Sequence, residues 1–457
     1  MAKIICITTG LTGILNASLE LVERLKESGH EVSYAAPRDV GDKLESHHVS
    51  FKKLPEIKLK YDAGVPEFKG FLKKINRFFY KVKNQEKRKK ETLEMIEPKA
   101  FLTLVKNEKP DFLIIDIELH EYIIKAYSEQ LNFVLLSQWF SLWNRKGLPY
   151  LLHDTIPGRG WKGSNVAIYF SWKIIQLKRW LAFSWQKIYT VSTDRRSVLL
   201  SFSKQEKFPL KWIKENYWPG PFSYDALPVI SMTAEEMEFP HDPRPNHFYV
   251  GAMVNENRVD KIEKSNNGFS IEDVFDYQKK VGGKLIYCSV STLLEGDLNF
   301  IEKLIQVFQD EKNWILIIGM GGLINETRLG KLPENVFAFS YVPQLKVLAK
   351  ADLSINHGGI HTINECVFFK VPMLVYSGKK SDQNGCAARV DFHRLGLMAD
   401  KDIDSPEQIR EKINEVLTNK KYNENIEKMN QVFQKYTNEK KLERIIEKSI
   451  RGGINLK

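Results

Sequence analysis

The sequence predicts an α/β fold in which two doubly wound domains face each other across a cleft. Its 457 residues exceed what a single hydrophobic core usually serves, so two domains of ordinary size are expected. Short apolar runs alternate with segments of helical periodicity, in two sets that a polar stretch separates. This alternation is typical of parallel sheets covered by helices, whose ligands lie at the carboxyl ends of the strands.

The first set predicts an N-terminal Rossmann-like domain over residues 1–252. Its strands are continuous apolar runs that suit burial on both faces of a sheet: IICIT, EVSYA, DFLIID (111–116), FVLLS (133–137) and HFYVG (247–251). After the first strand, a helical repeat over residues 16–28 ends at Gly29. Residues 137–222 hold eight of the nine tryptophans and predict a helical insertion. Most of these indoles are expected in its core, and a few are candidates for an acceptor pocket or a lipid interface.

The second set predicts a C-terminal Rossmann-like domain over residues 284–430, which a linker, 253–283, joins to the first. Its strands are KLIYCSV, WILIIG, VFAFS, DLSIN and VPMLVY, with helices near 298–310, 344–350, 383–395 and 405–419 and one that begins at about 359. We expect a last helix, 431–457, to return to the N-terminal domain.

The charge balance favours anionic partners. The formal net charge is +11 at pH 7, with 68 Lys and Arg against 57 Asp and Glu. Much of the excess lies between residues 52 and 91, in KKLPEIKLK and FLKKINRFFYKVKNQEKRKKE. Within residues 68–92, apolar side chains recur at helical spacing. This segment is either an amphipathic helix packed on the core, which we favour, or a peripheral membrane contact with snorkelling lysines. No recognition motif supports a nucleic-acid partner.

The compartment predicted is the cytoplasm, with the inner face of the membrane as a peripheral site. The N-terminus lacks a signal-peptide pattern, and no run is long and charge-free enough to span a bilayer. The four cysteines are far apart and are expected to be reduced thiols.

The segment DLSINHGGIHTINE predicts an anion site. A strand that ends at Asn356 runs through His357, Gly358 and Gly359 into a helix, so amide groups and the positive helix end point at one place. Thr362 adds a donor, and Glu365 lies two turns on, where a carboxylate accepts hydrogen bonds from ribose hydroxyls. Phosphate followed by ribose indicates a nucleotide. In the alternative interpretation His357 only ends the strand and Glu365 is a surface residue.

The stretch HGGIHTINECVFFKVPMLVYSGKKSDQNGCAARV resembles the donor signature of the UDP-glycosyltransferase family. The resemblance extends over residues 341–396, in which YVPQLKVLAKADLSINHGG keeps the spacing of the family and Gly396 matches its final glycine. It implies the glycosyltransferase B (GT-B) fold, a nucleotide-sugar co-substrate, UDP-linked above all, no permanently bound cofactor and no metal.

The resemblance also implies roles for single residues. Tyr341 stands where the family has a Trp that stacks on the base, the Val342 backbone reads the base edge, and Gln344 contacts the ribose. Glu365 is implied to hold the ribose hydroxyls, and Asp382 with Gln383 the hydroxyls of the sugar. The residues implied to surround the diphosphate are Thr292, His357, Gly359 and Thr362. The D-x-D from Asp402 to Asp404 precedes Ser405-Pro406 and is interpreted as a helix start.

The histidine that serves as the family's base is replaced by Ile14. Asp116 matches the aspartate that orients that histidine, and a buried Asp can itself act as base. His120, beyond Asp116, is a second candidate, with Glu118 or Asp116 beside it, or else a plain surface histidine. Two further explanations are an acceptor that needs little deprotonation and a protein that binds the donor without turnover.

The leading hypothesis is an inverting glycosyltransferase. It moves a sugar from a UDP- or dTDP-activated donor to a lipophilic or aromatic small molecule. The alternatives are a catalytically silent nucleotide-sugar-binding auxiliary protein and a nucleotide-sugar epimerase of the same fold.

Overall fold

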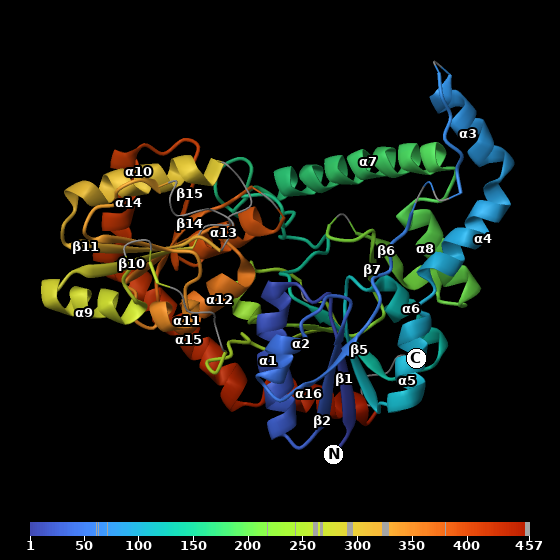
Figure 1. The fold of residues 1–457 in the computed structure, drawn as a ribbon, viewed down its shortest axis with the longest axis horizontal. Helices are drawn as coiled ribbons and strands as arrows, with labels where there is room; N and C mark the ends of the chain where they lie inside the picture. Colours follow the sequence, from blue (N-terminus) through green and yellow to red (C-terminus); the bar gives the residue numbers. More distant parts are fainter. Residues whose placement is uncertain are drawn as a thin grey trace.

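Two parallel sheets, each covered by helices on both faces, make up the molecule (Figure 1). The structure is a computed structural model, and it describes residues 1–60, 62, 64–70, 72–216, 218–242, 244–258, 264–265, 268–289, 296–321, 329–379 and 381–452. Both sheets follow the doubly wound pattern, which confirms the predicted α/β class.

The N-terminal sheet has seven parallel strands in the order β3-β2-β1-β4-β5-β8-β9. Its strands are β1 (Lys3–Ile7), β2 (Glu31–Ala36), β3 (Ser50–Lys53), β4 (Phe112–Asp116), β5 (Phe133–Ser137), β8 (Val229–Ser231) and β9 (His247–Tyr249). In register, Ile4 pairs with Val32 on one side and with Phe112 on the other. The strand order therefore reverses between β1 and β4. Asp116, the last residue of β4, lies at this switch point.

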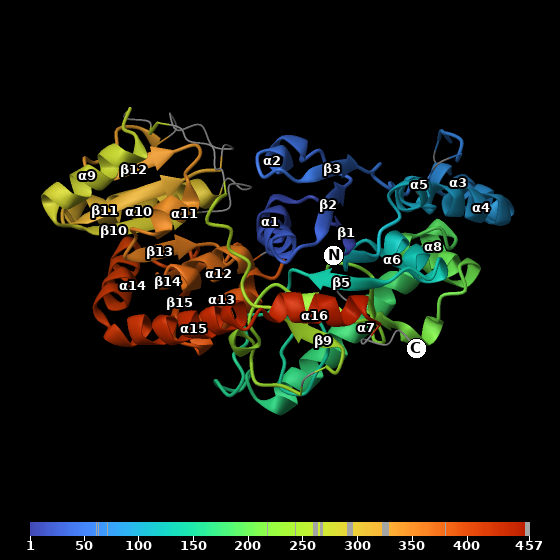
Figure 2. The ribbon, with the colours of Figure 1, turned by 90° about the horizontal axis from the view of Figure 1, so that it is seen from below.

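Nine α-helices surround this sheet in the described part of the chain. They are α1 (Thr12–Glu27), α2 (Gly41–Glu45), α3 (Lys73–Lys83), α4 (Gln85–Ile96), α5 (Lys99–Glu108), α6 (His120–Ser128), α7 (Asn165–Thr190), α8 (Arg195–Gln205) and α16 (Lys441–Ile450). A short antiparallel pair, β6 (Ile213–Glu215) and β7 (Phe222–Tyr224), lies beside α8. Leu442 and Ile446 of α16 are buried in one apolar cluster with residues of α1 and β1, and Arg24 of α1 forms an ion pair with Glu443. The chain thus ends against the N-terminal sheet (Figure 2).

The C-terminal sheet has six parallel strands in the order β12-β11-β10-β13-β14-β15. They are β10 (Lys284–Ser289), β11 (Trp314–Gly319), β12 (Val336–Phe339), β13 (Leu353–Asn356), β14 (Met373–Tyr376) and β15 (Gly396–Ala399). The helices are α9 (Ile271–Val281), α10 (Gly296–Asp310), α11 (Gln344–Leu348), α12 (Ile360–Phe368), α13 (Gln383–Phe392), α14 (Pro406–Thr418) and α15 (Lys420–Asn438). Within the stretch 253–283, α9 buries Ile271 and Val274 against this sheet. The order reverses between β10 and β13, so His357 follows the second switch point.

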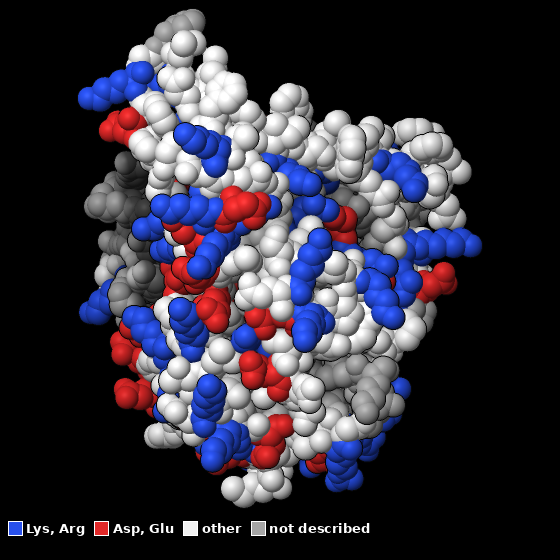
Figure 3. All heavy atoms as spheres, turned by 90° about the vertical axis from the view of Figure 1, so that its right-hand side faces the viewer, with Lys and Arg blue, Asp and Glu red and all other residues white. Residues whose placement is uncertain are grey.

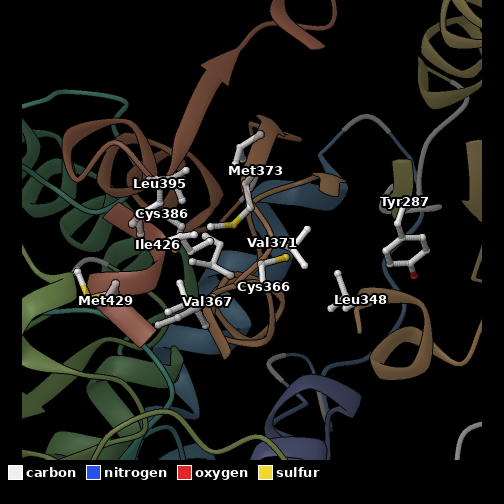
Figure 4. Packing of buried hydrophobic residues seen from close by; sticks show 14 of the residues in the cluster. Tyr287, Leu348, Cys366, Val367, Val371, Met373, Cys386, Leu395, Ile426 and Met429 are labelled. Atoms are coloured by element: carbon white, nitrogen blue, oxygen red, sulfur yellow. The ribbon is translucent and has the colours of Figure 1, made fainter. Parts of the chain in front are cut away.

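An apolar cluster joins the two halves of the molecule. Cys366, Cys386 and Ile426 of the C-terminal half lie in it (Figure 4), together with Phe140 and Met237 of the N-terminal half. Beside the cluster, the guanidinium of Arg389 pairs with the carboxylate of Glu238, and both side chains are 1% exposed. The two sheets are therefore held by a buried interface, which places their switch points face to face.

The tryptophans of the insertion divide into buried and exposed groups. Trp143 and Trp172 are buried, whereas Trp161, Trp180 and Trp185 are 64–81% exposed. The expectation that most of these indoles are core is therefore wrong for Trp161 and for Trp180 and Trp185 of α7, although Trp172 of the same helix is buried. Among the described residues, no helix is long and apolar enough to cross a membrane.

Candidate functional site

The loop between β13 and α12 builds a place for an anion. Gly358 has a φ of +85°, and its amide donates a hydrogen bond of 2.9 Å to Oδ1 of Asn356. This turn ends at Gly359, which precedes α12, and no described side chain caps the helix. The first amides of α12 therefore keep their hydrogen-bonding capacity at the positive end of the helix, where a phosphate group binds well.

Two of the predicted diphosphate ligands lie at this helix end. His357 is half-buried, and its Nδ1 lies 3.4 Å from the carbonyl oxygen of Ser289 at the end of β10. Thr362 is half-buried in the first turn of α12. The contact between His357 and Ser289 links the ends of β10 and β13, the two strands at the switch point. Thr292 lies outside the described residues.

Glu365 is part of a buried hydrogen-bond network. Its Oε1 accepts a hydrogen bond of 2.7 Å from Nη1 of Arg258, and its Oε2 accepts one from Nε2 of Gln344. Oε1 of Gln344 in turn accepts a bond of 3.1 Å from the hydroxyl of Tyr287. The side chains of Arg258 and Glu365 are 5% and 7% exposed. Glu365 and Gln344 therefore lie together, as expected, but Glu365 is already paired with Arg258, which was not predicted to lie there.

The remaining donor residues line the same edge of the C-terminal sheet. Tyr341, after β12, is 39% exposed, and Val342 beside it is half-buried. Asp382 is buried ahead of α13, and it accepts hydrogen bonds from Ser381 Oγ (3.0 Å) and Cys386 Sγ (3.3 Å). Burial raises the pKa of Asp382 above its usual value. The side chain of Gln383 turns back to the loop, where its Oε1 accepts a bond of 3.0 Å from the amide of Gly378.

On the N-terminal side, two carboxyl groups lie at the end of β4. Asp116 is fully buried, and it accepts hydrogen bonds from the amides of Thr9 (3.3 Å) and Glu118 (3.1 Å). Burial raises the pKa of Asp116 to about 6. Burial, and then the charge of Asp116, raise the pKa of Glu118 to about 8, while Asp382 across the cleft raises it further by a smaller amount. Three carboxyl groups from both domains thus act on one another electrostatically.

His120 lies apart from this acidic group. Its ring is 2% exposed, and Nδ1 lies 2.9 Å from the hydroxyl of Tyr224. The edge of the ring packs against Gly220, and burial lowers the pKa of His120 to about 3. These surroundings make His120 a core residue, which does not favour it as the base. Ile14, at the position of the family's base, is also fully buried, in the core around α1.

The starts of α1 and α12 meet across the cleft. A Cβ atom on Gly13 would lie 3.3 Å from Cδ2 of His361, so the two helix ends are in direct contact. Burial lowers the pKa of His361 to about 4, and the charge of Arg258 adds to this effect. The start of α1 in the N-terminal domain therefore lies against the start of α12 in the C-terminal domain.

Comparisons with known proteins agree with this geometry. Residues 317–437 match the family model described as "Erythromycin biosynthesis protein CIII-like, C-terminal domain". The UDP-glucosyltransferase YdhE of Bacillus subtilis is 35% identical over 165 residues, which are 36% of this chain and 41% of the relative. The NDP-glycosyltransferase YjiC of Bacillus subtilis is 24% identical over 416 residues, 88% of this chain and 86% of the relative.

Solved structures give the same fold over the whole chain. The glycotransferase of kitacinnamycin superposes with a TM-score of 0.67 at 17% identity, covering 98% of this chain and 99% of the other. CalG4, the calicheamicin glycosyltransferase, gives a TM-score of 0.63 at 16% identity and covers 98% of both chains. Together, the family model, the named relatives and the solved structures indicate a glycosyltransferase of the GT-B fold. Its alignments with the first two curated relatives span about two fifths of their length, 41% and 42%.

The D-x-D from Asp402 to Asp404 belongs to a helix start, as the sequence indicated. Ser405 forms a capping box with Gln408 ahead of α14, with Pro406 at the first helical position. Asp402 pairs with Lys379 at 2.7 Å, and Asp404 pairs with Lys412. Both carboxylates therefore have cationic partners within the C-terminal domain.

Two residues of the site were missed by sequence reasoning. Arg258 follows a strand in a polar stretch of weak periodicity, where an isolated arginine has no pattern to distinguish it. Glu118 stands two residues after Asp116, and the sequence analysis of the base did not choose it as a site residue. Its position after a strand at a switch point was the available signal.

Proposed function

We propose that the chain is an inverting glycosyltransferase that moves a sugar from a UDP- or dTDP-activated donor to a lipophilic or aromatic small molecule. The observation that carries the proposal is the uncapped start of α12 after His357, Gly358 and Gly359. It offers amide donors and a positive helix end to a diphosphate, and the leaving nucleoside diphosphate carries the charge that develops on transfer.

The donor groups around this helix end fit the parts of a nucleotide sugar. Tyr341 is exposed enough to stack on a base, and Gln344 with Glu365 is placed to accept ribose hydroxyls after Arg258 shifts its contact. Asp382 is proposed to bind the sugar, and Gln383 to assist it. The names of relatives support both nucleotides: YdhE is a UDP-glucosyltransferase, and the solved glycosyltransferase VinC is in complex with dTDP.

The acceptor side supports an apolar or aromatic substrate. The rings of Trp139 and Trp218 pack edge to face with centroids 4.4 Å apart, and both are half-buried against the interdomain cluster. Gln138, next to Trp139, donates a bond of 3.3 Å to Glu118. Aromatic walls beside buried carboxyl groups suit a lipophilic molecule with a hydroxyl group. One relative of this chain is named an oleandomycin glycosyltransferase, from Streptomyces antibioticus.

In this proposal Asp116 is the base, and Ile14 only fills the core. The Asp116 carboxylate takes the proton of the acceptor hydroxyl as its oxygen attacks the anomeric carbon. The bond to the nucleoside diphosphate breaks on the opposite face, so the configuration inverts. Glu118 holds the acceptor hydroxyl or keeps the pKa of the pair high enough for proton transfer. Neutral donors and the α12 dipole stabilise the diphosphate, and no metal ion takes part.

Product analysis tests this function. The chain is incubated with UDP-glucose and with dTDP-glucose, each with a panel of phenolic and macrolide acceptors, and products are detected by mass spectrometry. We expect a product of one added hexose with at least one pair, and its anomeric configuration by NMR should be opposite to that of the donor. If no donor is transferred or hydrolysed with any acceptor, the enzyme proposal is wrong.

A further inference from the structure

The helix α7 presents a mainly apolar face to solvent, in which exposed lysines are interspersed. Six side chains along its length are 56–71% exposed: Tyr169, Phe170, Leu177, Trp180, Trp185 and Ile188. Their spacing places them on one side of a 26-residue helix. The opposite side holds it to the protein through Ile168 and Trp172, which are 4% and 2% exposed. Exposed aromatic residues at this density, on a single face, indicate an interaction surface.

The neighbouring helix α3 extends the same surface. α3 contacts α7, and its residues Ile75 and Phe79 are 51% and 64% exposed. The ammonium group of Lys81 on α3 lies 4.7 Å from the centre of the ring of Tyr189 on α7. The two helices therefore form one projecting surface at the upper edge of the N-terminal half (Figure 1).

The charge of this surface decides which partner it fits. α7 carries four Lys or Arg and α3 carries five, and neither helix contains an Asp or Glu. Asp62 pairs with two of these cations, Arg77 and Lys81, whereas Lys173 and Lys178 are exposed on α7. Figure 3 shows mainly uncharged and basic side chains along the upper edge of this side of the molecule. A second copy of the chain would set cations against cations, so its surface does not complement this one.

We propose that α7 and α3 together bind the surface of a membrane rich in anionic lipid. The helix α7 lies in the interface plane with its aromatic face among the acyl chains and headgroups, and the lysines at its borders contact lipid phosphates. The 26 residues of α7 give a contact about 39 Å long. The inference goes beyond the proposed function and does not depend on it. If both hold, a lipophilic acceptor reaches the cleft from the bilayer.

Vesicle flotation of the full chain tests the proposal. The probes are vesicles of phosphatidylcholine alone and of phosphatidylcholine with phosphatidylglycerol. We expect the protein to float with the anionic vesicles and to bind less at high salt, because salt screens the lysine contacts. Failure of the wild-type chain to float with anionic vesicles would overturn the proposal.

Two pairs of substitutions separate the apolar and ionic contributions. Trp180→Ser with Trp185→Ser should weaken binding at least about tenfold, because two exposed indoles no longer enter the lipid. Lys173→Gln with Lys178→Gln should weaken binding to anionic vesicles about fivefold for each lysine at low salt. Ile403→Ser, at an apolar residue that is 74% exposed on the C-terminal domain, is the matched control and should bind as the wild type does.

Three further results would count against the proposal. Wild-type binding by both double variants would show that this face is not the contact. Equal loss in Ile403→Ser would show a nonspecific effect. A wild-type dimer that becomes a monomer in the tryptophan variant, by light scattering, would assign the face to a second copy. Because the substituted residues are exposed, thermal unfolding should be unchanged, and transfer to a soluble acceptor should persist, so this result is independent of the proposed activity.

Discussion

At the scale of single residues, burial raises the pKa values of the two carboxyl groups to which the proposal assigns the proton transfer. Asp116 has a pKa of about 6 because it is buried, although two amides donate to it. Glu118 has a pKa of about 8, since burial and the neighbouring carboxylate both disfavour its charge. A group with a pKa near the working pH accepts a proton efficiently, so this pair fits the task that an imidazole performs in relatives.

Asp116→Asn tests the proposed base. We expect kcat to fall at least about 100-fold, because the amide cannot accept the proton, while the affinity for nucleoside diphosphate stays unchanged. Steady-state kinetics and calorimetry with UDP or dTDP measure the two quantities. A variant with wild-type kcat would remove Asp116 from the mechanism. His120→Asn serves as the comparison, since a core residue affects stability more than the pH profile.

The pH dependence of the reaction separates Asp116 from Glu118. A base works in its deprotonated form, so kcat/KM should rise with pH through a pKa of about 6, and ionisation of Glu118 should add a second step at about 8. In Glu118→Gln the upper step should disappear, and the lower one should stay or move down, because a neighbouring negative charge is lost. An unchanged upper step in this variant would show that another group titrates there.

Contacts between site residues were predictable where both residues belong to one sequence motif. They were less predictable where the two residues are distant in sequence. The meeting of Gln344 with Glu365 followed from the matched signature and is seen in the structure. The pairing of Glu365 with Arg258 did not follow from the sequence. The two residues are 107 positions apart, and only the tertiary fold brings the polar segment with Arg258 to α12. Likewise, the burial of His120 depends on Gly220 and Tyr224 of a later segment.

At the scale of elements, the start of α12 requires a glycine at 358. Its φ is +85°, and a Cβ atom would lie 2.9 Å from the carbonyl oxygen of Gln383. Gly358→Ala should therefore lower the free energy of unfolding by about 1–3 kcal/mol and should weaken nucleotide binding, because the helix end shifts. Gly282→Ala is the control: its φ is +66°, but no atom lies within 4 Å of its added Cβ.

Chemical denaturation and nucleotide titration of both variants check this prediction. The control should lose stability by about 1 kcal/mol through backbone strain alone and should keep its affinity for nucleotide. If Gly358→Ala binds UDP or dTDP as tightly as Gly282→Ala does, the turn is not part of the binding site.

Continuous apolar runs were predictable as strands, whereas β3, β8 and the exposure of α7 were not. The continuous apolar runs of β1, β4 and β5 predicted that these segments are strands of a parallel sheet. β3 has the sequence SFKK, with one apolar residue, so no apolar run marks it as a strand. β8 has three residues and was not predicted. The aromatic residues of α7 suggested a core, because sequence shows which face is apolar but not whether anything covers it.

At the scale of the whole molecule, a buried ion pair helps to hold the two domains in register. Arg389 of α13 donates through Nε to Glu238 at 2.6 Å, and its guanidinium lies over the rings of Phe140 and Phe239. Arg389→Met should lower the free energy of unfolding by about 3–5 kcal/mol, because it leaves a buried carboxylate without its cation.

Thermal and urea unfolding measure this effect. Arg159→Met, which removes an exposed partner of Asp391, is the control and should cost less than about 1 kcal/mol. Adding Glu238→Leu to Arg389→Met should recover part of the stability, since the unpaired charge is then removed. A loss in Arg389→Met no larger than in the control would show that the pair does not stabilise the interface.

The central claim is that the diphosphate of a nucleotide sugar binds at the start of α12, between the two domains. A crystal structure of the chain with UDP or dTDP, grown in the presence of a chelator, tests it most directly. The account predicts phosphate oxygens at about 2.7–3.2 Å from the first amides of α12 and from His357, with the ribose beside Glu365. A nucleotide bound at another place, or an empty α12 helix end at saturating nucleotide, would contradict it.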